Sequence, residues 1–256
     1  MKKYISILLI CSWIFLTGSL FSQTISAGVN AGISIPQLKS SGDNEISKDY
    51  SSRLAATFGL FADAGITQQF SVKVAVNYAG QGGKRQGMQP VIAIPPALSQ
   101  MLPPGTMLYA NFKNESVLNY LEMPVTAKFT WGDILKYYIN AGPYAGILLS
   151  ATQKTEGASQ LYLDKKGMQP LGIQGQPLPA QSFKADTDIK KDINTINFGF
   201  TGGIGLAYPV GGAGEIILDA RGAYGLTPIQ KDTKANGKSR TGGLFLTLGY
   251  AYTFQR

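Results

Sequence analysis

The sequence predicts an all-β protein: a closed antiparallel transmembrane β-barrel of about eight strands, with long outer loops and short periplasmic turns. Three observations lead to this fold. Eight segments alternate apolar with small or polar residues, no stretch after residue 22 is apolar enough for a membrane helix, and long and short connections alternate. A tilted strand of about ten residues crosses a bilayer, so each segment has roughly the length of one span.

Alternation with a period of two marks strands that have two unlike faces. The last segment, for example, sets Leu246 and Leu248 against Thr247. Pro124 and Pro143 interrupt two segments and remove hydrogen-bond donors, so we expect a bulge or a local loosening there. The predicted strands are residues 25–35, 54–65, 70–79, 121–131, 137–150, 195–208, 215–224 and 244–254.

The connections come in two lengths. Bacterial outer-membrane barrels have short turns on the periplasmic side and longer loops outside, so this order predicts an even number of strands with both termini in the periplasm. The long connections, which are polar and rich in proline, glycine, lysine and aspartate, are residues 36–53, 80–119, 151–194 and 225–243. The short ones are residues 67–69, 132–133 and 209–214.

Periodicity alone leaves open which face points outward, since a soluble lipocalin-like barrel would bury its apolar face. The interior of an eight-stranded barrel has room only for its own side chains, and the bulky apolar set would overfill it. Aromatic residues of the apolar face also gather beside the short turns, as in a membrane-interface girdle. They are Phe70, Phe129, Trp131, Tyr137, Tyr208, Tyr252 and Phe254. We therefore expect the apolar face to contact lipid.

The chain begins with the features of a secretory signal. Lys2 and Lys3 precede a short apolar run, and small and polar residues follow as far as Ser22. Polar residues interrupt the run before it reaches the length of a membrane anchor. We divide the chain into a signal peptide, residues 1–22, and a β-barrel domain, residues 23–256, which is exported to the cell outer membrane.

Signal cleavage after Ser22 is a testable prediction. The mature protein should begin at Gln23 and should fractionate with outer membranes in a sucrose gradient, because its strands carry an apolar face that is unstable in water. N-terminal sequencing of the purified protein checks the cleavage point. Recovery of the protein in the soluble periplasm would contradict the barrel.

The residue inventory limits the chemistry of the mature chain. Histidine is absent and the single cysteine, Cys11, lies in the signal peptide, which excludes disulfides, thiolate nucleophiles, imidazole bases and Cys/His zinc sites. The net charge of +8, or +6 after loss of Lys2 and Lys3, is spread among acidic residues without a basic stripe. We expect no catalytic residues, no cofactor, no metal site and no nucleic-acid partner.

Charged residues lie on the face of the strands that we assign to the lumen. Unpaired charges are costly to bury, so we expect them to pair across the narrow barrel. A path for protons or ions, or a carboxylate pair for acid–base work, is the functional interpretation. We favour a structural one, a polar network that fills the lumen. The residues are Asp63, Lys73, Glu122, Lys128, Asp219 and Arg221.

Two long loops share a four-residue motif. Gly-Met-Gln-Pro follows a basic pair at residues 87–90 and at residues 167–170, and each copy precedes an apolar run that contains proline. The repeat has two explanations that remain open. One is chance or a shared turn chemistry, and the other is that the two loops pack against each other. Residues 91–104 are too apolar to be exposed without purpose, so we hypothesise that they pack with residues 171–179 over the barrel mouth and bind a partner. The rival interpretation is a cap on the lumen or contact with the lipopolysaccharide layer. The residues of interest are Met88, Pro90, Ile92, Ile94, Met168 and Pro170.

Several motifs resemble those of the PorT-like outer-membrane β-barrel family. They are Tyr-Leu-Glu-Met-Pro at 120–124, Ala-Gly-Pro-Tyr-Ala-Gly at 141–146 and Leu-Asp-Ala-Arg-Gly-Ala-Tyr-Gly-Leu-Thr at 218–227, with the opening 27–32 and the closing 248–254. The resemblance covers nearly all of residues 23–256 and implies an outer-membrane location and about eight strands. It implies no activity, and the long loops depart from a minimal member.

Three functions follow as expectations. The first is a barrel with a filled lumen that contacts outer-membrane lipid and is structural or binds a protein or a surface ligand through its outer loops. The second is a small pore or transport-related barrel. The third is a membrane-embedded enzyme, which the residue inventory disfavours.

Overall fold

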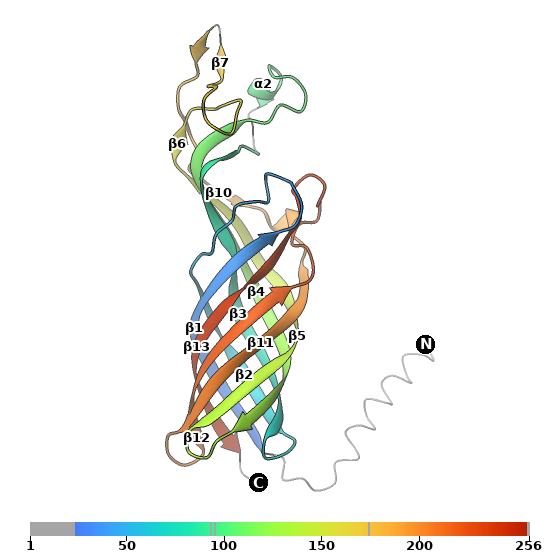
Figure 1. Cartoon of the computed structure of the whole chain (residues 1–256), viewed down its shortest axis with the longest axis vertical. Helices are drawn as coiled ribbons and strands as arrows, with labels where there is room; N and C mark the ends of the chain where they lie inside the picture. The colour runs from blue at the N-terminus through green and yellow to red at the C-terminus, as the bar shows by residue number, and fades with distance from the viewer. Residues whose placement is uncertain (1–23, 93, 95, 174, 255–256) are drawn as a thin grey trace, which may run out of the picture.

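Eight long antiparallel strands close into one ring in the computed structural model (Figure 1). The structure describes residues 24–92, 94, 96–173 and 175–254, so the predicted signal peptide lies outside the described residues. The ring order is β5-β11-β12-β13-β1-β2-β3-β4, and pairing of β4 with β5 closes it, which confirms the predicted fold. The strands are β1 (Ile25–Ser40), β2 (Ala55–Gly65), β3 (Phe70–Pro90), β4 (Tyr109–Trp131), β5 (Lys136–Glu156), β11 (Ile196–Pro209), β12 (Gly214–Gly225) and β13 (Ser239–Phe254).

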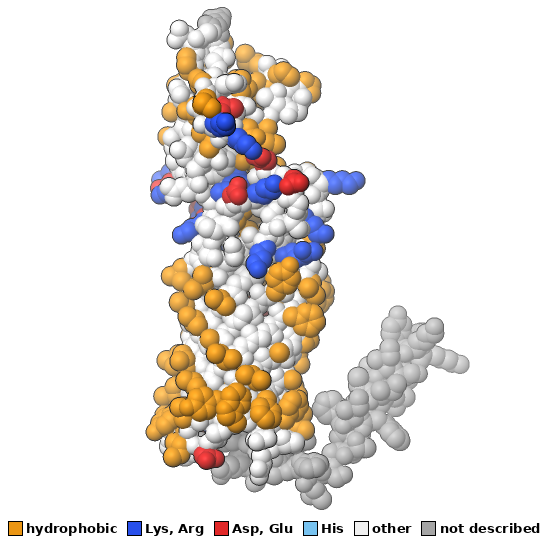
Figure 2. Space-filling view, in the orientation of Figure 1, with side chains coloured by type: hydrophobic (Ala, Val, Ile, Leu, Met, Phe, Trp, Pro, Cys, Tyr) orange, Lys and Arg blue, Asp and Glu red, His pale blue; other side chains and the backbone are white. Residues whose placement is uncertain are grey.

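The apolar face of the strands points outward. Leu60, Ile204 and Leu248 are each more than 60% exposed, whereas Asn77 and Thr201, at inward positions, are buried. Figure 2 shows hydrophobic side chains spread over the barrel and densest near the end with the short turns. Most charged side chains in this view lie toward the opposite end. A protein surface this apolar is stable against lipid tails rather than water.

Aromatic rings gather at the end of the barrel with the short turns. The Trp131 ring lies 6.0 Å from that of Phe129 and 6.2 Å from that of Tyr137, so the girdle crosses from β4 to β5. On β13, Tyr252 and Phe254 meet edge to face at 5.3 Å. This placement suits the amphipathic interface between lipid and water.

Several strands are longer than the sequence predicts. The prediction of a loop over residues 80–119 is wrong for most of its length, because residues 80–90 belong to β3 and pair with residues 109–119 of β4. β5 continues to Glu156, and β1 pairs with β13 as far as Ser40 and Ser239. These extensions lie beyond the apolar belt, where both faces of a strand are polar, so the apolar alternation that reveals a strand is missing.

Pro124 and Pro143 loosen the ladder locally, as expected, without changing its register. Among the described residues, no ladder pairing joins Ala75 to Pro124 or Val125 to Pro143, and the pairs on either side continue in register. The register shift in the described ladder between β4 and β5 lies instead at Asn119 and Tyr120. The bulge therefore falls where the barrel meets the extension rather than at a proline.

Parts of two long connections, 80–119 and 151–194, fold into a lobe at the end opposite the short turns (Figure 1). We define the distal lobe as residues 88–112 and 157–184. It holds helix α2 (Pro96–Ser99) and two small antiparallel pairs, β6 (Ala158–Ser159) with β9 (Gln181–Ser182) and β7 (Gly172–Ile173) with β8 (Gln176–Pro177).

Two short elements lead from the distal lobe back to the ring. β10 (Ala185–Asp188) pairs with β5, and the 3-10 helix η1 (Lys190–Asp192) precedes β11. No helix in the described part of the chain is long and apolar enough to span a membrane.

Candidate functional site

The lumen near the short turns is crossed by a salt bridge. Lys128 Nζ on β4 lies 2.6 Å from Asp63 Oδ2 on β2, and Asp63 is buried. The other carboxylate oxygen, Oδ1, has no hydrogen-bond partner among the described residues. Lys128 is therefore the main compensation for a charge that has been removed from water.

Lys73 lies next to this pair but rests on aromatic rings. Its Nζ is 4.4 Å from the centroid of the Phe61 ring and 5.9 Å from that of Tyr138. No salt bridge joins Lys73 to a carboxylate in the described part of the chain. An ammonium group over a ring face is stabilised by the ring quadrupole, and the effect grows when water is excluded.

A second charged layer crosses the lumen farther from the short turns. Glu122, which is only 2% exposed, accepts a hydrogen bond of 2.7 Å from Gln81 Nε2. Arg221 Nη2 lies 4.0 Å from Glu122 Oε2, and the Arg221 guanidinium lies 4.6 Å from the centroid of the Phe245 ring. The layer joins strands on opposite sides of the ring, so it braces the barrel from within.

Asp219 is held by neutral donors. Its Oδ2 accepts a hydrogen bond of 2.6 Å from the Tyr138 hydroxyl and a longer one, of 3.5 Å, from Asn140 Nδ2. The expectation that all six charges form ion pairs is thus wrong for Lys73 and Asp219. The large inward rings of Phe61 and Tyr138 fill the space near them and supply their partners instead.

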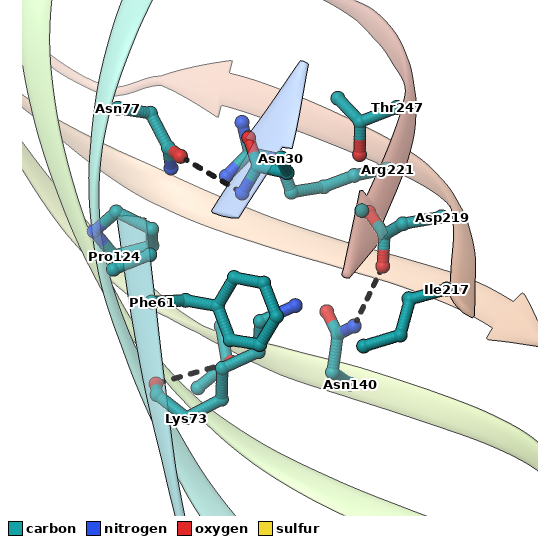
Figure 3. A pocket seen from close by; sticks show the side chains of 13 residues that line it. Asn30, Phe61, Lys73, Asn77, Pro124, Asn140, Ile217, Asp219, Arg221 and Thr247 are labelled. Carbon is teal, nitrogen blue, oxygen red and sulfur yellow. Dashed lines mark hydrogen bonds between the residues drawn. The ribbon is translucent and has the colours of Figure 1, made fainter. Parts of the chain in front are cut away.

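A small cavity remains in the middle of the lumen (Figure 3). Its volume is about 30 Å³, enough for about two water molecules at roughly 10–15 Å³ each. The polar groups that face it include those of Asn30, Lys73, Asn77, Asn140 and Asp219. Within the described residues no three His, Cys, Asp or Glu side chains gather as a metal site would require. The lumen is therefore a packed interior whose remaining space is polar and no larger than a few water molecules.

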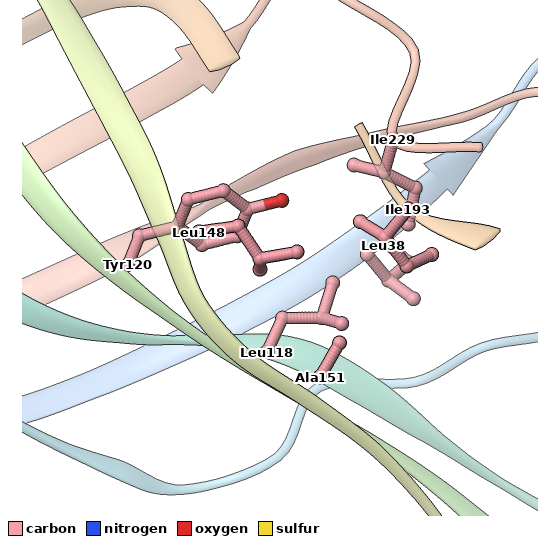
Figure 4. Close-up of a cluster of buried hydrophobic side chains, with 7 residues drawn as sticks. All are labelled: Leu38, Leu118, Tyr120, Leu148, Ala151, Ile193 and Ile229. Carbon is pink, nitrogen blue, oxygen red and sulfur yellow. The ribbon is translucent and has the colours of Figure 1, made fainter. Parts of the chain in front are cut away.

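The mouth of the barrel is filled by an apolar plug (Figure 4). We define the mouth plug as the buried cluster of Leu38, Leu118, Tyr120, Leu148, Ala151, Ile193 and Ile229. Ile193 and Ile229 come from the outer connections, and the backbone N–H of Asn194 donates to the carbonyl of Ile229 at 2.7 Å. Two loops are thus tied together and insert side chains between the strands.

The distal lobe has a core of its own, separate from the mouth plug. Leu108 and Ala110 are fully buried there, with Phe112, Leu161 and Leu171 beside them. Both apolar runs contribute partly buried side chains to this core: Val91, Ile94, Leu98 and Leu102 from one, Leu178 from the other. The two runs therefore pack together, as hypothesised, at the mouth end of the barrel, but the mouth itself is filled by the mouth plug and not by this core (Figure 1).

The two Gly-Met-Gln-Pro copies meet without sharing a structure. Residues 87–90 end strand β3, whereas residues 167–170 follow a turn capped by Asp164, whose Oδ1 accepts from the Gln169 and Met168 N–H groups at 2.7 and 2.9 Å. These hydrogen bonds, above all the one from Gln169, lower the pKa of Asp164 below its ordinary value. Gly167 adopts φ +72°, and a Cβ there would lie 2.7 Å from Met88 Cε, so Met88 occupies the space that glycine leaves. Gly87 also has a positive φ, of +111°, but it lies within strand β3, so the two copies do not share a turn.

The outer surface of the distal lobe combines apolar and basic side chains. Pro90 is buried and Pro170 is exposed. Tyr109 pairs with Pro90, Tyr162 pairs with Pro170, and the two tyrosines pair with each other, so the backbone links the two segments. Lys165 reaches Glu45 of the connection between β1 and β2 at 3.2 Å. The exposed large apolar side chains are Ile92, Met101, Met107, Leu163, Met168 and Ile173.

Sequence reasoning missed the residues that fill the mouth. Ile193 and Ile229 stand in long connections without strand periodicity, so nothing in the sequence distinguished them from the other apolar residues of those connections. Gln81 was missed because the predicted strand ended at residue 79. Tyr138 was placed inward by the alternation, but nothing in the sequence indicated that its hydroxyl would bind Asp219.

Comparisons with known proteins agree with this architecture. The family model described as outer membrane protein beta-barrel domain matches residues 21–231. A search of curated proteins gives no match.

Solved structures of similar fold include three outer-membrane proteins. OprG from Pseudomonas aeruginosa is 10% identical, with 92% of this chain and 97% of that chain covered and a TM-score of 0.43. A major outer membrane protein from Thermus thermophilus is 11% identical, with 91% and 100% covered and a TM-score of 0.44. Neisserial surface protein A is 13% identical, with 91% and 98% covered and a TM-score of 0.37. Since the family model spans most of the sequence, the protein belongs to the outer membrane protein β-barrel domain family and is an outer-membrane β-barrel that contacts membrane lipid.

Proposed function

We propose that this protein is a binding barrel whose distal lobe captures a protein or a surface ligand outside the cell. The observation that carries the proposal is that the lobe has its own buried core yet leaves Met101 and Met168 62% and 68% exposed. Methionine is flexible and polarisable, and it is common on surfaces that accept partners. Loops on a rigid barrel are the usual place for binding residues.

The rival functions have less support. A small pore would need a continuous path, whereas the mouth plug, the Glu122–Arg221 layer and the Asp63–Lys128 bridge follow one another along the lumen. We propose that the lumen network is structural and that the protein is not an enzyme, because the mature chain has no histidine or cysteine to activate a nucleophile. Stable conductance steps from the purified monomer in a planar bilayer would support the pore instead.

We further propose that the chain is a PorT-like member of its family and that residues 1–22 are a cleaved signal. The motifs at 120–124 and 218–227 support the first proposal, and the basic, then apolar, then polar start supports the second. Neither of these two proposals implies a role in protein secretion.

A variant without the distal lobe tests the binding proposal. Gln86 pairs with Lys113, so an Asn-Gly turn can join them, and a second Asn-Gly can join Glu156 to Lys184 beside the Thr155–Ala185 pair. The ring and the mouth plug stay intact, so the variant should fold and show the shift in gel mobility between heated and unheated samples. Binding should be lost.

Binding is measured by photo-crosslinking in living cells. A crosslinker at Met101 or Met168 should give a discrete adduct, and one at Thr233, exposed on the connection between β12 and β13, should not. If the lobeless barrel folds and the adducts from the full chain are as frequent at Thr233 as at Met168, the lobe is no binding site. If the lobeless barrel fails to fold, the lobe is a structural cap.

A further inference from the structure

Two basic side chains stand on the outside of the barrel at the upper edge of the apolar belt. Lys39 of β1 and Arg240 of β13 are directly paired across the two strands. They continue the outward series that includes Ile33 on β1 and Leu244 on β13, both exposed. Figure 2 shows lysine and arginine side chains gathered immediately above the hydrophobic surface of the barrel. This height corresponds to the headgroups of the outer leaflet.

A groove runs from Lys39 down the lipid-facing surface, and Arg240 stands beside its upper end as the strand partner of Lys39. The groove has a volume of about 490 Å³ and is lined by Lys39, Phe200, Tyr224 and Leu244, with backbone of β11, β12 and β13 as its floor. Gly242 pairs with Tyr224 on one side and with Gln37 on the other, and its missing side chain leaves room for Lys39, two residues along β1 from Gln37, to reach the Tyr224 ring. Lys39 Nζ lies 5.6 Å from the centroid of the Tyr224 ring. The ammonium group therefore sits at the top of an apolar channel.

The charge of the basic pair is not neutralised by the protein. The described residues include no salt bridge to Lys39 or Arg240, and the described hydrogen bond of Arg240 uses Nε alone, to the Leu226 carbonyl at 3.0 Å. No Asp or Glu occurs in the strand segments around the groove, residues 36–41, 196–203, 220–227 and 239–246. Two cations above an apolar channel match a phosphate group that carries acyl chains.

We infer that this groove is a binding site for a phosphorylated lipid of the outer leaflet. Lys39 and Arg240 hold the phosphate, and an acyl chain lies along Phe200, Tyr224 and Leu244. The groove faces the bilayer, which a free phosphate ion does not enter, so we assign the ligand to the membrane rather than to solution. The site is separate from the distal lobe, and it stands whether or not the lobe binds a partner.

Native mass spectrometry of the full barrel in detergent tests the inference, with dioleoyl phosphatidic acid and dioleoyl phosphatidylcholine as probes. Phosphatidic acid should form the tighter complex. Each basic residue near an anionic lipid contributes roughly a fivefold gain in affinity, so Lys39→Gln with Arg240→Gln should weaken phosphatidic acid binding about 25-fold. The matched control, Lys84→Gln with Lys113→Gln, neutralises two exposed lysines on the β3–β4 extension and should leave binding unchanged.

A second variant tests the apolar part of the site without touching a charge. A Cβ at Gly222 would meet nothing closer than 3.8 Å, so Gly222→Val fits the strand and fills the groove. It should weaken dioleoyl phosphatidic acid binding, and it keeps the inference testable if the charge variant fails to fold. Equal affinity of the wild type for the two lipids would overturn the inference. So would equal losses in the control, or displacement of the lipid by millimolar inorganic phosphate.

Discussion

Replacing Lys128 with methionine is expected to destabilise the barrel by about 3–5 kcal/mol, because the change leaves the buried Asp63 carboxylate without its cation. Methionine keeps most of the length and the apolar stem of the side chain, so lost packing contributes little. Urea unfolding of the refolded protein in lipid vesicles measures the effect. Trp131 reports it, since the other tryptophan, Trp13, belongs to the predicted signal peptide.

Two controls separate the buried pair from a general effect of lost charge. Lys154→Met removes an exposed lysine from β5 and should change the free energy of unfolding by less than about 0.5 kcal/mol. Asp63→Asn combined with Lys128→Met removes both charges and should recover much of the loss. If Lys128→Met is as stable as Lys154→Met, the salt bridge does not support the lumen.

Replacing Leu108 with alanine should open the distal lobe while the barrel stays folded. Leu108 is fully buried at the centre of the lobe, and truncation of a buried leucine costs about 2–5 kcal/mol. A loss of local stability of this size raises the population of molecules with an unfolded distal lobe by a factor of roughly 30 or more. Trypsin should therefore cut after Lys165 and Lys166 more than about tenfold faster in the variant, with the fragments read by mass spectrometry.

The control for this variant lies in the same lobe. Leu163 is 43% exposed, so Leu163→Ala should be cleaved at nearly the wild-type rate. Unfolding of the barrel by urea should be unchanged in both variants. Equal cleavage of the Leu108 and Leu163 variants would mean that the lobe has no cooperative core.

The membrane-spanning part of the fold could be predicted from the sequence because lipid imposes a strict rule on it. Every outward position must be apolar and every inward position must fit a narrow lumen, so Leu244, Leu246 and Leu248 indicate strand, face and register at once. The rule ends where the bilayer ends. Residues 80–90 continue the strand, but their buried positions hold polar side chains such as Gln81, Arg85 and Gln89, so the sequence shows no apolar alternation there.

The contacts of the candidate site could be predicted only in part. Alternation placed Asp63, Glu122 and Asp219 in the lumen, but partner choice depends on which side chains reach across the ring. The length of Tyr138 decides that Asp219 receives a hydroxyl, and no spacing in the sequence encodes that distance. Contact between the two Gly-Met-Gln-Pro copies had a sequence signal, whereas their different backbone conformations had none.

The shared extension of β3, β4 and β5 sets the height of the distal lobe above the membrane. Residues 80–87 of β3 lie between the predicted membrane span and the distal lobe. At about 3.3 Å per residue and a tilt near 40°, these eight residues reach roughly 20 Å beyond the span. Three hydrogen-bonded strands are far stiffer than a single loop, so this stalk is a spacer of fixed length. If the lobe binds a partner, a water-soluble molecule can attach there without displacing lipid. The length of the strands then fixes the distance between that molecule and the membrane surface.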